Sequence, residues 1–187
     1  MTVPVYIGAA IFVLVVTFVV FRVAVRRDYL RSGRLTVLST FLEYVAICAW
    51  VIFGYLNRPP DWPAVHVGAT QEIVGWVLFV GGWILTLTGI LRLGLGRSHG
   101  LKVNALRQTG LYRFSRNPQA VAFFVAILGY LILWPTWRNA GVLVLVAVLL
   151  HLMILSEEDH LRDVFGEEYE RYCKRVARYV RLKGQSR

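Results

Sequence analysis

Long apolar runs alternate with short polar segments along the whole of this chain. Runs of this length that are almost free of charge are typical of helices that cross a bilayer. We therefore expect an all-α, polytopic membrane protein with about five transmembrane helices, built as a single membrane domain of residues 1–187. The predicted spans are about Val3–Val25, Leu38–Leu56, Ile73–Leu91, Ala120–Trp134 and Ala140–Leu155.

The segment that follows the last apolar run has a different pattern. From Glu157 to Val180, apolar residues recur every three or four positions, and charged residues fill the positions between them. This spacing predicts a C-terminal amphipathic helix on the cytoplasmic face, with Gly166 as the position at which it is interrupted. The basic residues from Lys174 to Arg187 favour an anchor on the lipid surface.

Two polar clusters flank the last two spans. Only Pro135–Asn139 joins these spans, so they are predicted to form a hairpin that brings Gly110–Pro118 close to Ser156–His160. Pro118 lacks a backbone donor and biases Asn117 away from helical dihedrals, which favours a folded loop in the first cluster. Irregular backbone at a membrane must be surrounded by protein or water, and we therefore expect this loop to line a cavity.

Composition and charge support a membrane protein and predict its orientation. The hydrophobic fraction of 57% over 187 residues is too high for an ordinary soluble domain. The net charge of +10 comes from basic blocks beside the apolar runs, which indicates attraction to anionic lipid and no nucleic-acid partner. The predicted inner loops, 22–34 and 92–118, hold eleven basic residues, whereas the outer loops hold two, Arg58 and Arg138. This asymmetry places the N-terminus outside, and the polar clusters and the C-terminus in the cytoplasm.

The positions of cysteine and histidine give no metal or redox signature. Cys48 lies within an apolar run and Cys173 in the basic tail, so no disulfide is expected. The four histidines show no zinc-type spacing with these cysteines. We therefore expect no metal site.

A set of residues in the last three-fifths of the chain resembles a known family pattern. In order, these residues are Gly110, Tyr112, Arg116, Asn117, Pro118, Glu157, Glu158, Leu161, Phe165, Gly166, Tyr169, Tyr172, Val176 and Arg178. The order resembles that of integral-membrane methyltransferases of the isoprenylcysteine carboxyl methyltransferase and phospholipid methyltransferase type. It covers about residues 72–181, so we expect residues 72–187 to form a methyltransferase-like core after two N-terminal spans and an outer loop in residues 1–71. Ala120 and Ala122 depart from the pattern, because relatives often have Tyr and Gly shortly after the Pro.

The resemblance implies S-adenosylmethionine as cofactor and a lipophilic acceptor of the isoprenyl, fatty-acyl or phospholipid type. It also implies that the Arg-Asn-Pro loop and the Glu-Glu pair bind the cofactor. Methyl transfer requires no covalent protein nucleophile, and the sequence does not choose among a carboxylate, a thiol and an amine as acceptor. The implied cofactor-binding residues are Gly110, Leu111, Tyr112, Arg116, Asn117, Pro118, Glu157 and Glu158.

The chemistry of this cofactor agrees with these residue types. Arg116 or Arg113 can pair with its carboxylate, and Glu157 or Glu158 with its ammonium group. Adjacent helical residues point about 100° apart, so we expect one glutamate to bind and the other to orient. Arg116 and Glu158 are the first catalytic candidates. His151 shares the face of Glu158 and is either a third candidate or a histidine bonded to a neighbouring helix.

Three weaker features leave the choice between function and packing open. Glu43 lies inside the second span, where an acid is a functional candidate, but we favour a structural role near the interface, where its carboxylate reaches water or pairs with Arg31 or Arg34. The glycines of the third span favour close helix packing. Gly94–Gly96 resembles an element assigned to the methyl donor, although a flexible exit from the helix explains it equally well.

Two other functions are compatible with the sequence. Membrane sterol or enone reductases share a similar C-terminal Arg-His-Pro hairpin and use NADPH, although they are typically longer. A non-enzymatic helical bundle that binds lipid head groups would also carry Arg and Glu pairs at the interface. The resemblance favours S-adenosylmethionine-dependent methyl transfer at the cytoplasmic membrane face over both.

Overall fold

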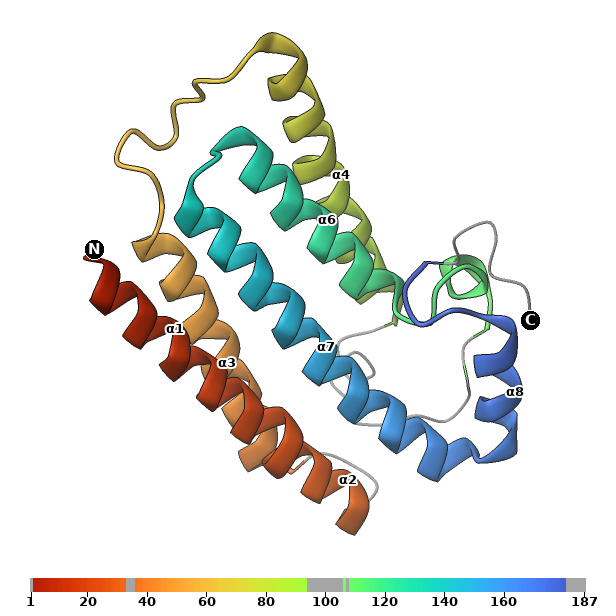
Figure 1. Ribbon diagram of the computed structural model, residues 1–187. Helices are drawn as coiled ribbons and strands as arrows, with labels where there is room; N and C mark the ends of the chain where they lie inside the picture. Colours follow the sequence, from red (N-terminus) through yellow and green to blue (C-terminus); the bar gives the residue numbers. More distant parts are fainter. Residues whose placement is uncertain (1, 33–35, 94–105, 107, 181–187) are drawn as a thin grey trace.

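The structure is a computed structural model that describes residues 2–32, 36–93, 106 and 108–180 (Figure 1). Within these residues the secondary structure is entirely helical, which confirms the predicted all-α fold. The helices are α1 (Val3–Phe18), the π-helical η1 (Val19–Val25), α2 (Arg26–Ser32), α3 (Val37–Leu56), α4 (Ala69–Leu93), the 3₁₀-helical η2 (Gly110–Arg113), α6 (Pro118–Leu133), α7 (Trp137–Phe165) and α8 (Glu167–Arg175).

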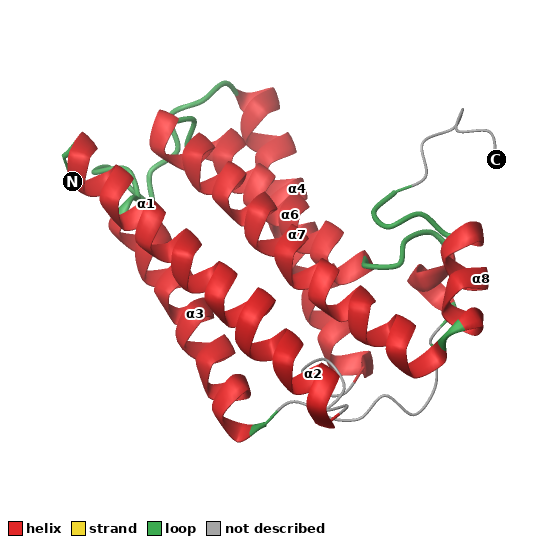
Figure 2. Cartoon of the chain, turned by 60° about the horizontal axis from the view of Figure 1, so that its bottom comes forward, coloured by secondary structure: helices red, strands yellow, loops and turns green. Residues whose placement is uncertain are grey.

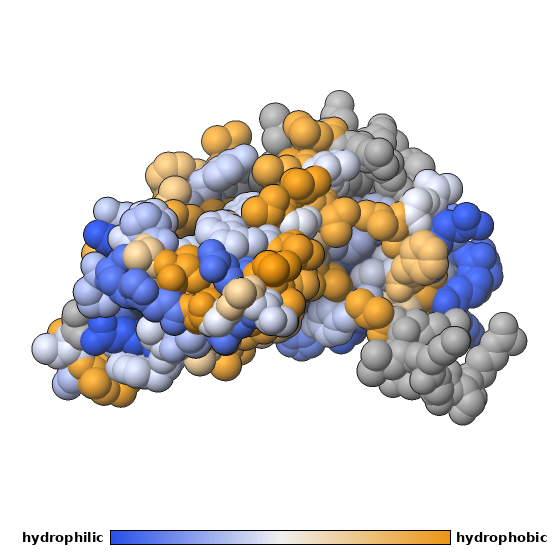
Figure 3. Space-filling view, turned by 90° about the horizontal axis from the view of Figure 1, so that it is seen from above, coloured by the Kyte–Doolittle hydropathy of each residue, from blue (hydrophilic) through white to orange (hydrophobic). Residues whose placement is uncertain are grey.

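Four helical stretches are long and apolar enough to cross a membrane: Val3–Tyr29, Val37–Leu56, Ala69–Leu91 and Trp137–Phe165. α6 is also apolar but has only 16 residues. Between 17% and 39% of the most apolar window of each stretch is buried, so most of this hydrophobic surface faces outward. In Figure 3, hydrophobic side chains occupy the middle of one face of the molecule and hydrophilic ones gather toward its two ends. The chain is an integral membrane protein, as predicted.

α7 lies between two pairs of helices (Figures 1 and 2). α1 packs with α3 on one side of it, and α4 packs with α6 on the other. α4 and α6 approach closely because glycine removes a side chain at their crossing: a Cβ added to Gly82 would lie 2.6 Å from Ala126 N. The predicted packing role of the third-span glycines is confirmed at Gly82, whereas Gly81 faces open space.

Capping residues and a proline determine where three helices begin. Thr36 Oγ1 accepts a hydrogen bond from Ser39 N at the start of α3. Thr136 Oγ1 accepts one from Asn139 N at the start of α7. Each satisfies a backbone donor that the first helical turn leaves free. Pro118 is the first residue of α6, a position where its missing N–H is not needed.

The polar cluster Ser156–His160 lies within α7, so the first part of the helix predicted from Glu157 is continuous with the last span. α7 continues well beyond the predicted end of the fifth span at Leu155 and reaches Phe165. Gly166 then ends α7 with φ +47°, a dihedral that glycine adopts at little cost. The predicted interruption at Gly166 is therefore confirmed, and the cluster is held on a continuous rigid helix.

The tail is not helical as far as Val180, which corrects the predicted boundary. α8 ends earlier, and Val176 is already extended. Residues 176–180, here called the tail segment, bond to the polar loop of residues 110–118 instead of continuing the helix. The bonds run from Arg116 N to Ala177 O (2.9 Å), from Asn117 Nδ2 to Arg178 O (3.1 Å) and from Ser115 Oγ to Arg178 O (3.4 Å).

A π-helical turn, Val19–Val25, interrupts the first long helix and lies close to two bonds with neighbouring helices. Ser156 Oγ of α7 donates to Phe21 O within the turn at 2.7 Å. Just before the turn, Trp50 Nε1 of α3 donates to Thr17 Oγ1 at 2.8 Å. Both bonds are buried, so they attach the N-terminal helix firmly to α3 and α7.

Candidate active site

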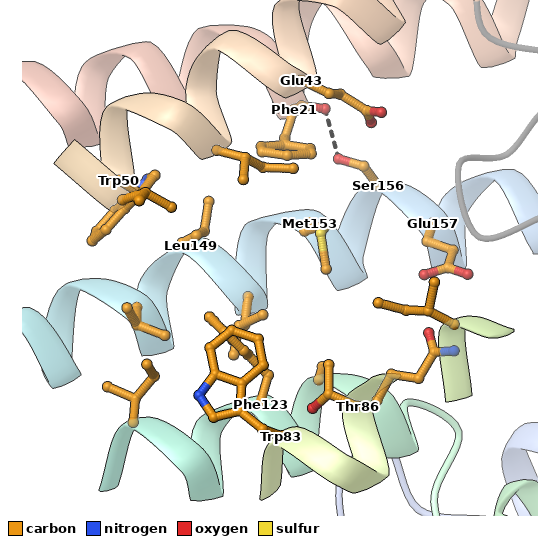
Figure 4. A pocket seen from close by; sticks show the side chains of 18 of the residues that line it. Phe21, Glu43, Trp50, Trp83, Thr86, Phe123, Leu149, Met153, Ser156 and Glu157 are labelled. Carbon is orange, nitrogen blue, oxygen red and sulfur yellow. Dashed lines mark hydrogen bonds between the residues drawn. The ribbon is translucent and has the colours of Figure 1, made fainter. Parts of the chain in front are cut away.

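A cavity of about 740 Å³ lies beside α7, between the two helix pairs. Its volume is within the usual range of small-molecule sites, about 300–1,000 Å³. Its lining extends from Arg58 and Trp62, after α3, to Tyr169 and Tyr172 of α8. The cavity therefore runs along the apolar helices and ends at the predicted polar clusters. Its apolar walls include Trp50, Trp83, Phe123, Leu149 and Met153 (Figure 4).

Three of the predicted cofactor-binding residues line this cavity: Tyr112, Arg116 and Glu157. They come from the polar loop and from α7, so the structure brings the two predicted clusters together at one end of the cavity. Tyr172 of α8 supports this end, because its hydroxyl donates to Tyr112 O at 2.8 Å. The hairpin between the clusters produces the proximity that the sequence predicted.

The other predicted residues of the polar loop shape it and do not line the cavity. Gly110 adopts φ +65°, a left-handed dihedral that favours glycine, and opens the turn η2. Leu111 is exposed. Asn117 donates to the tail segment, and Pro118 begins α6. Direct contact of these four residues with a cofactor stays a prediction.

Glu158 is buried, with 1% of its side chain exposed, and three arginines surround it. Arg178 of the tail segment is nearest, with Nη2 2.8 Å from Oε2. Arg116 Nη2 lies 3.4 Å from Oε1, and Arg162 Nη2 lies 3.5 Å from Oε2. A buried carboxylate requires such compensation, and breaking it is costly. Glu158 is thus already bound by cations of the protein, and it holds Arg116 in position.

Arg116 joins the polar loop to α7 and α8. Its guanidinium contacts Glu158 and the sulfur of Cys173. Its Nε is buried, and no acceptor among the described residues reaches it. Gln119 Nε2 and His160 Nδ1 are also buried without a partner, and both residues line the cavity. Buried polar atoms in folded proteins almost always find a partner in protein, water or ligand, so these three atoms form a set of polar groups that a ligand in the cavity can satisfy.

Two acidic side chains of the cavity also lack an ion-pair partner among the described residues. Glu157, the neighbour of Glu158 on α7, is exposed to the cavity, and Glu43 reaches it from α3 (Figure 4). Within the described part of the chain, neither carboxylate forms an ion pair. Of the structural roles expected for Glu43, the ion pair with Arg31 is therefore not formed, Arg34 lies outside the described residues, and contact with water stays a prediction.

His151 lies on the face of α7 that carries Glu158, but it does not line the cavity. Its Nδ1 is hydrogen-bonded to the Tyr179 hydroxyl at 2.6 Å. The tail segment therefore contacts this face of α7 at two points. Tyr179 is hydrogen-bonded to His151, and Arg178 donates to Glu158. A catalytic role for His151 stays a prediction.

Burial keeps the tyrosines of α8 neutral. It raises the pKa of Tyr172 to about 12, and the charge of Arg116 opposes this only in part. The pKa of Tyr169 is also raised, first by burial and then by the charge of Glu158. Hydrogen bonds to Glu158 raise the pKa of Arg178. These phenols therefore remain hydrogen-bond donors and the Arg178 guanidinium remains charged at physiological pH.

Gln119, His160 and Arg178 are site residues that were not predicted from the sequence. His160 follows Glu157 by three positions on a helix, so helical spacing alone could have pointed to it. Gln119 is in the first turn of α6, directly after the polar loop. Arg178 belongs to the family pattern, but its contact with Glu158, twenty positions earlier on α7, has no local signal in the sequence.

Comparison with known protein families matches residues 70–168 to the family described as phospholipid methyltransferase, which is just over half of the 187 residues. The chain belongs to this family. The matched residues contain nearly all of α4 and the whole of α6 and α7, together with the polar loop. Glu43 on α3 and Arg178 in the tail segment lie outside the match, although both are at the site.

The sequence identity between this phospholipid methyltransferase family member and individual relatives is low. Nickel-cobalt-cadmium resistance protein NccN from Alcaligenes xylosoxydans xylosoxydans is 27% identical over an alignment of 145 residues that covers 74% of this chain. The chain spans 66% of the length of that relative, slightly less than two thirds. An uncharacterized protein from Haemophilus influenzae is 31% identical over 62 residues, covering 30% of this chain and 98% of that protein. No solved structure matches the chain.

Ala120 and Ala122, which depart from the family pattern, have different surroundings. Ala120 lines the cavity, where a larger side chain would reduce its width. Ala122 is buried and packs α6 against α4, because its carbonyl oxygen lies close to Gly82. Gly94–Gly96, the possible donor-binding element, lies outside the described residues.

Proposed function

We propose that this protein transfers a methyl group from S-adenosylmethionine to a lipophilic acceptor. The observation that carries the proposal is a set of polar groups without partners at one end of an apolar cavity, within the part of the chain that the structure describes. This set offers both hydrogen-bond donors and an acceptor to a ligand that carries charges of both signs. It consists of Arg116 Nε, Gln119 Nε2, His160 Nδ1 and the Glu157 carboxylate.

These residues fit the charged end of S-adenosylmethionine, which carries a carboxylate and an ammonium group. Arg116 Nε and Gln119 Nε2 would donate to the carboxylate, and Glu157 would accept from the ammonium. The rings of Tyr112 and Tyr172 offer flat surfaces for the nucleoside. When bound, the cofactor supplies an electrophilic methyl group.

The contribution of the protein is mainly positioning. Methyl transfer requires the acceptor, the methyl carbon and the sulfur to be in line, which a preorganised site provides. Glu158, itself held by Arg162 and Arg178, fixes the Arg116 guanidinium. The bond from Tyr172 to Tyr112 O fixes the turn of the polar loop in the same way. Glu158 is thus assigned an orienting role and Glu157 the binding role.

The apolar part of the cavity supports a lipid-like acceptor. Its aromatic walls continue from Phe123 and Trp83 to Trp62 near the other end of the helices, so an apolar chain can lie along them. The description of the family also names phospholipids as substrates. We infer an acceptor of the isoprenyl, fatty-acyl or phospholipid type that enters from the membrane.

We place the polar end of the cavity in the cytoplasm. Basic residues concentrate at this end. Arg22 Nη1 lies 3.2 Å from Asp159 Oδ2, and Arg26 Nε lies 3.6 Å from the same oxygen. The positive-inside rule then assigns the polar loop, α8 and the C-terminus to the cytoplasmic side, and the N-terminus to the outside.

A reductase that uses NADPH is less compatible with the site. The phosphates of NADPH are anionic and require several cations. Among the described lining residues at the polar end, Arg116 is accompanied by two carboxylates, Glu43 and Glu157. These carboxylates would repel a polyphosphate, whereas they suit a ligand with positive groups.

Calorimetric titration of the protein purified in detergent tests the proposal. We expect S-adenosylmethionine to bind and NADPH not to bind. Glu157→Gln should weaken S-adenosylmethionine by about ten- to 150-fold, because a hydrogen bond to a charged group contributes about 1.5–3 kcal/mol. Glu168→Gln is the control, since Glu168 is an exposed residue of α8 that accepts a hydrogen bond from Gln108 and does not line the cavity. Binding of NADPH without S-adenosylmethionine would support the reductase, and binding of neither would support a non-enzymatic bundle.

A further inference from the structure

The cavity beside α7 has a second polar end, which the proposed reaction does not use. It lies at the end of α3 and away from the polar loop, and we call it the distal end. The described residues that line it are Tyr55, Arg58, Trp62, Tyr130 and Asn139. Asn139 and Glu157 both line the cavity from α7 and are eighteen positions apart, so about 27 Å of helix separates the two ends. From Val142 to Met153 the lining side chains of α7 are apolar (Figure 4).

Arg58 supplies the positive charge of the distal end. Its guanidinium carbon lies 3.8 Å from the centroid of the Tyr55 ring, and its Nη1 donates to Tyr55 O at 2.8 Å. Asp61, the acid in the same loop, has its Oδ2 3.1 Å from His66 Nε2 and forms no ion pair with Arg58. Within the described residues Arg58 is thus not neutralised by an acid, and most of its five N–H donors are available at the cavity wall.

Trp62 adds a second donor to the distal end. Its ring lies near that of Trp134, with centroids 6.4 Å apart and planes at 47°. Its indole N–H has no acceptor among the described residues, whereas Tyr130 and Asn139 are hydrogen-bonded to each other. Both donors follow directly after the apolar stretch that ends at Leu56, which places them at the depth of the lipid head groups. They therefore face the depth at which a phospholipid carries its phosphate.

The two ends of the cavity differ in charge. At the polar end, Arg116 is already paired with Glu158, and Glu43 and Glu157 add two carboxylates to the lining. At the distal end, the charged side chain of the described lining is Arg58. Charges interact more strongly in surroundings of low dielectric constant than in water. An amphiphile with an anionic head group therefore has one favourable orientation, with its head group at Arg58 and its chain toward the middle of the cavity.

We propose that the distal end binds the phosphate of a phospholipid, with Arg58 and Trp62 as donors and a lipid chain along the apolar walls. The planar guanidinium can bind two phosphate oxygens at once, which gives this contact its geometry. The walls offered to the chain include Val51, Trp83 and Ile127, and the cavity volume of about 740 Å³ suits one small ligand.

This lipid is a different ligand from the acceptor. The acceptor must bring its head group to the polar end, about 27 Å of helix away, whereas the lipid proposed here has its head group at Arg58. The two chains would share the same apolar walls, so the cavity holds one of them at a time. The inference goes beyond the proposed function and does not depend on it, because methyl transfer requires no ligand at the distal end.

The test compares hexadecyl phosphate with hexadecanol, which share one chain and differ in the phosphate. Each is titrated into the protein in a neutral detergent without cofactor, and the complexes are counted by native mass spectrometry. We expect the unchanged protein to prefer the phosphate by at least about tenfold, as for one hydrogen bond to a charged group. Arg58→Gln, shown to be monodisperse by size-exclusion chromatography, should reduce this preference to less than about threefold.

Arg138→Gln is the matched control, because Arg138 is another arginine at this end of the helices, in the first turn of α7, and does not line the cavity. It should retain the preference of the unchanged protein. A preference that survives in Arg58→Gln, or is lost equally in Arg138→Gln, would overturn the proposal. Inorganic phosphate in large excess should not displace hexadecyl phosphate, and displacement would identify a site for free phosphate instead of a lipid.

Photo-crosslinking of the unchanged protein locates the head group without any substitution. Hexadecyl phosphate with a diazirine on the carbon next to the phosphate should label residues between Tyr55 and Trp62, which are within reach of the distal donors. Labelling confined to the polar loop or to α8 would place the phosphate at Arg116, and the distal site would then be refuted even if Arg58→Gln failed to fold.

Discussion

Arg178 holds the Glu158 carboxylate through two nitrogens, with Nε 3.1 Å from Oε1 and Nη2 2.8 Å from Oε2. The arginine is in an extended tail and the glutamate on a long helix, so this pair attaches the end of the described chain to the centre of the fold. Glu158 already faces three arginines of the protein, so its direct contact with a cofactor stays a prediction. The arrangement explains why one member of an adjacent glutamate pair lines the cavity and the other does not.

Arg178→Ala is predicted to destabilise the protein. It leaves the buried Glu158 carboxylate with Arg116 and Arg162 alone and removes hydrogen bonds to a charged group. We expect the free energy of unfolding, measured by denaturation in mixed detergent micelles, to fall by about 1.5–3 kcal/mol. Arg171→Ala is the matched control, because its pair with Glu167 is exposed and should change stability by less than about 1 kcal/mol. Equal effects of the two variants would contradict a structural role of the Arg178 pair.

Gly82→Ala is predicted to separate α4 from α6. The added Cβ would lie 2.6 Å from Ala126 N, which is backbone and cannot rotate away. We expect a loss of about 1–3 kcal/mol in unfolding free energy, the usual cost of overpacking. Gly81→Ala, one residue away and facing open space, should be neutral or slightly stabilising, because alanine is the better helix former. If Gly81→Ala is the more harmful variant, the packing of this helix pair is wrong.

Tyr172→Phe is predicted to lower stability near neutral pH and to reduce its dependence on alkaline pH. Below pH 10 the variant loses only the hydrogen bond to Tyr112 O, about 0.5–1.5 kcal/mol. The folded-state pKa of Tyr172 is raised to about 12, above its ordinary value of about 10, so the unfolded chain ionises first as the pH rises. The stabilising contribution is complete below pH 10 and is lost between pH 10 and 12. The free energies of unfolding of the variant and of the unchanged protein should therefore approach each other as the pH rises from 10 to 12. A constant difference between them would argue against burial of the hydroxyl.

Cysteine accessibility is predicted to place residues 31 and 110 on the cytoplasmic side. Cysteines are introduced at Arg31, Gly110 and Arg58 in a background with Cys48 and Cys173 replaced by serine. A membrane-impermeant maleimide added to intact cells should label only the cysteine at Arg58, because positive charge is concentrated at the other end. Labelling at Arg31 or Gly110 before lysis would reverse the proposed orientation.

Local sequence patterns predicted the features that depend on a few neighbouring residues. Gly166 ends α7 and Pro118 begins α6 because of their own dihedral and donor constraints. The boundary at Val180 was wrong because periodicity describes one helix at a time. Backbone and side-chain bonds from the polar loop to Ala177 and Arg178 compete with the helix and determine its end.

The candidate site was predictable in part for the same reason. Tyr112, Arg116 and Glu157 lie on segments that the short hairpin must bring together. The position of Glu43 depends instead on how the N-terminal helix pair packs against α7, and no local pattern encodes that packing. An isolated acid near two arginines in sequence favours an ion pair, whereas the folded chain directs its side chain to the cavity.

The π-helical turn at Val19–Val25 changes which residues before and after it lie on the same face of the first helix. Twelve residues separate the buried Thr17 from Tyr29, which in a regular α-helix leaves the two about 120° apart around the axis. The wider turn takes up much of this difference and brings Tyr29 to the stack with His160. Deleting a single valine from the turn would restore the regular helix and rotate Tyr29 by about 100°. The N-terminal helix therefore contributes to the site only when its length is correct to one residue, a constraint of register that composition and hydrophobicity do not impose.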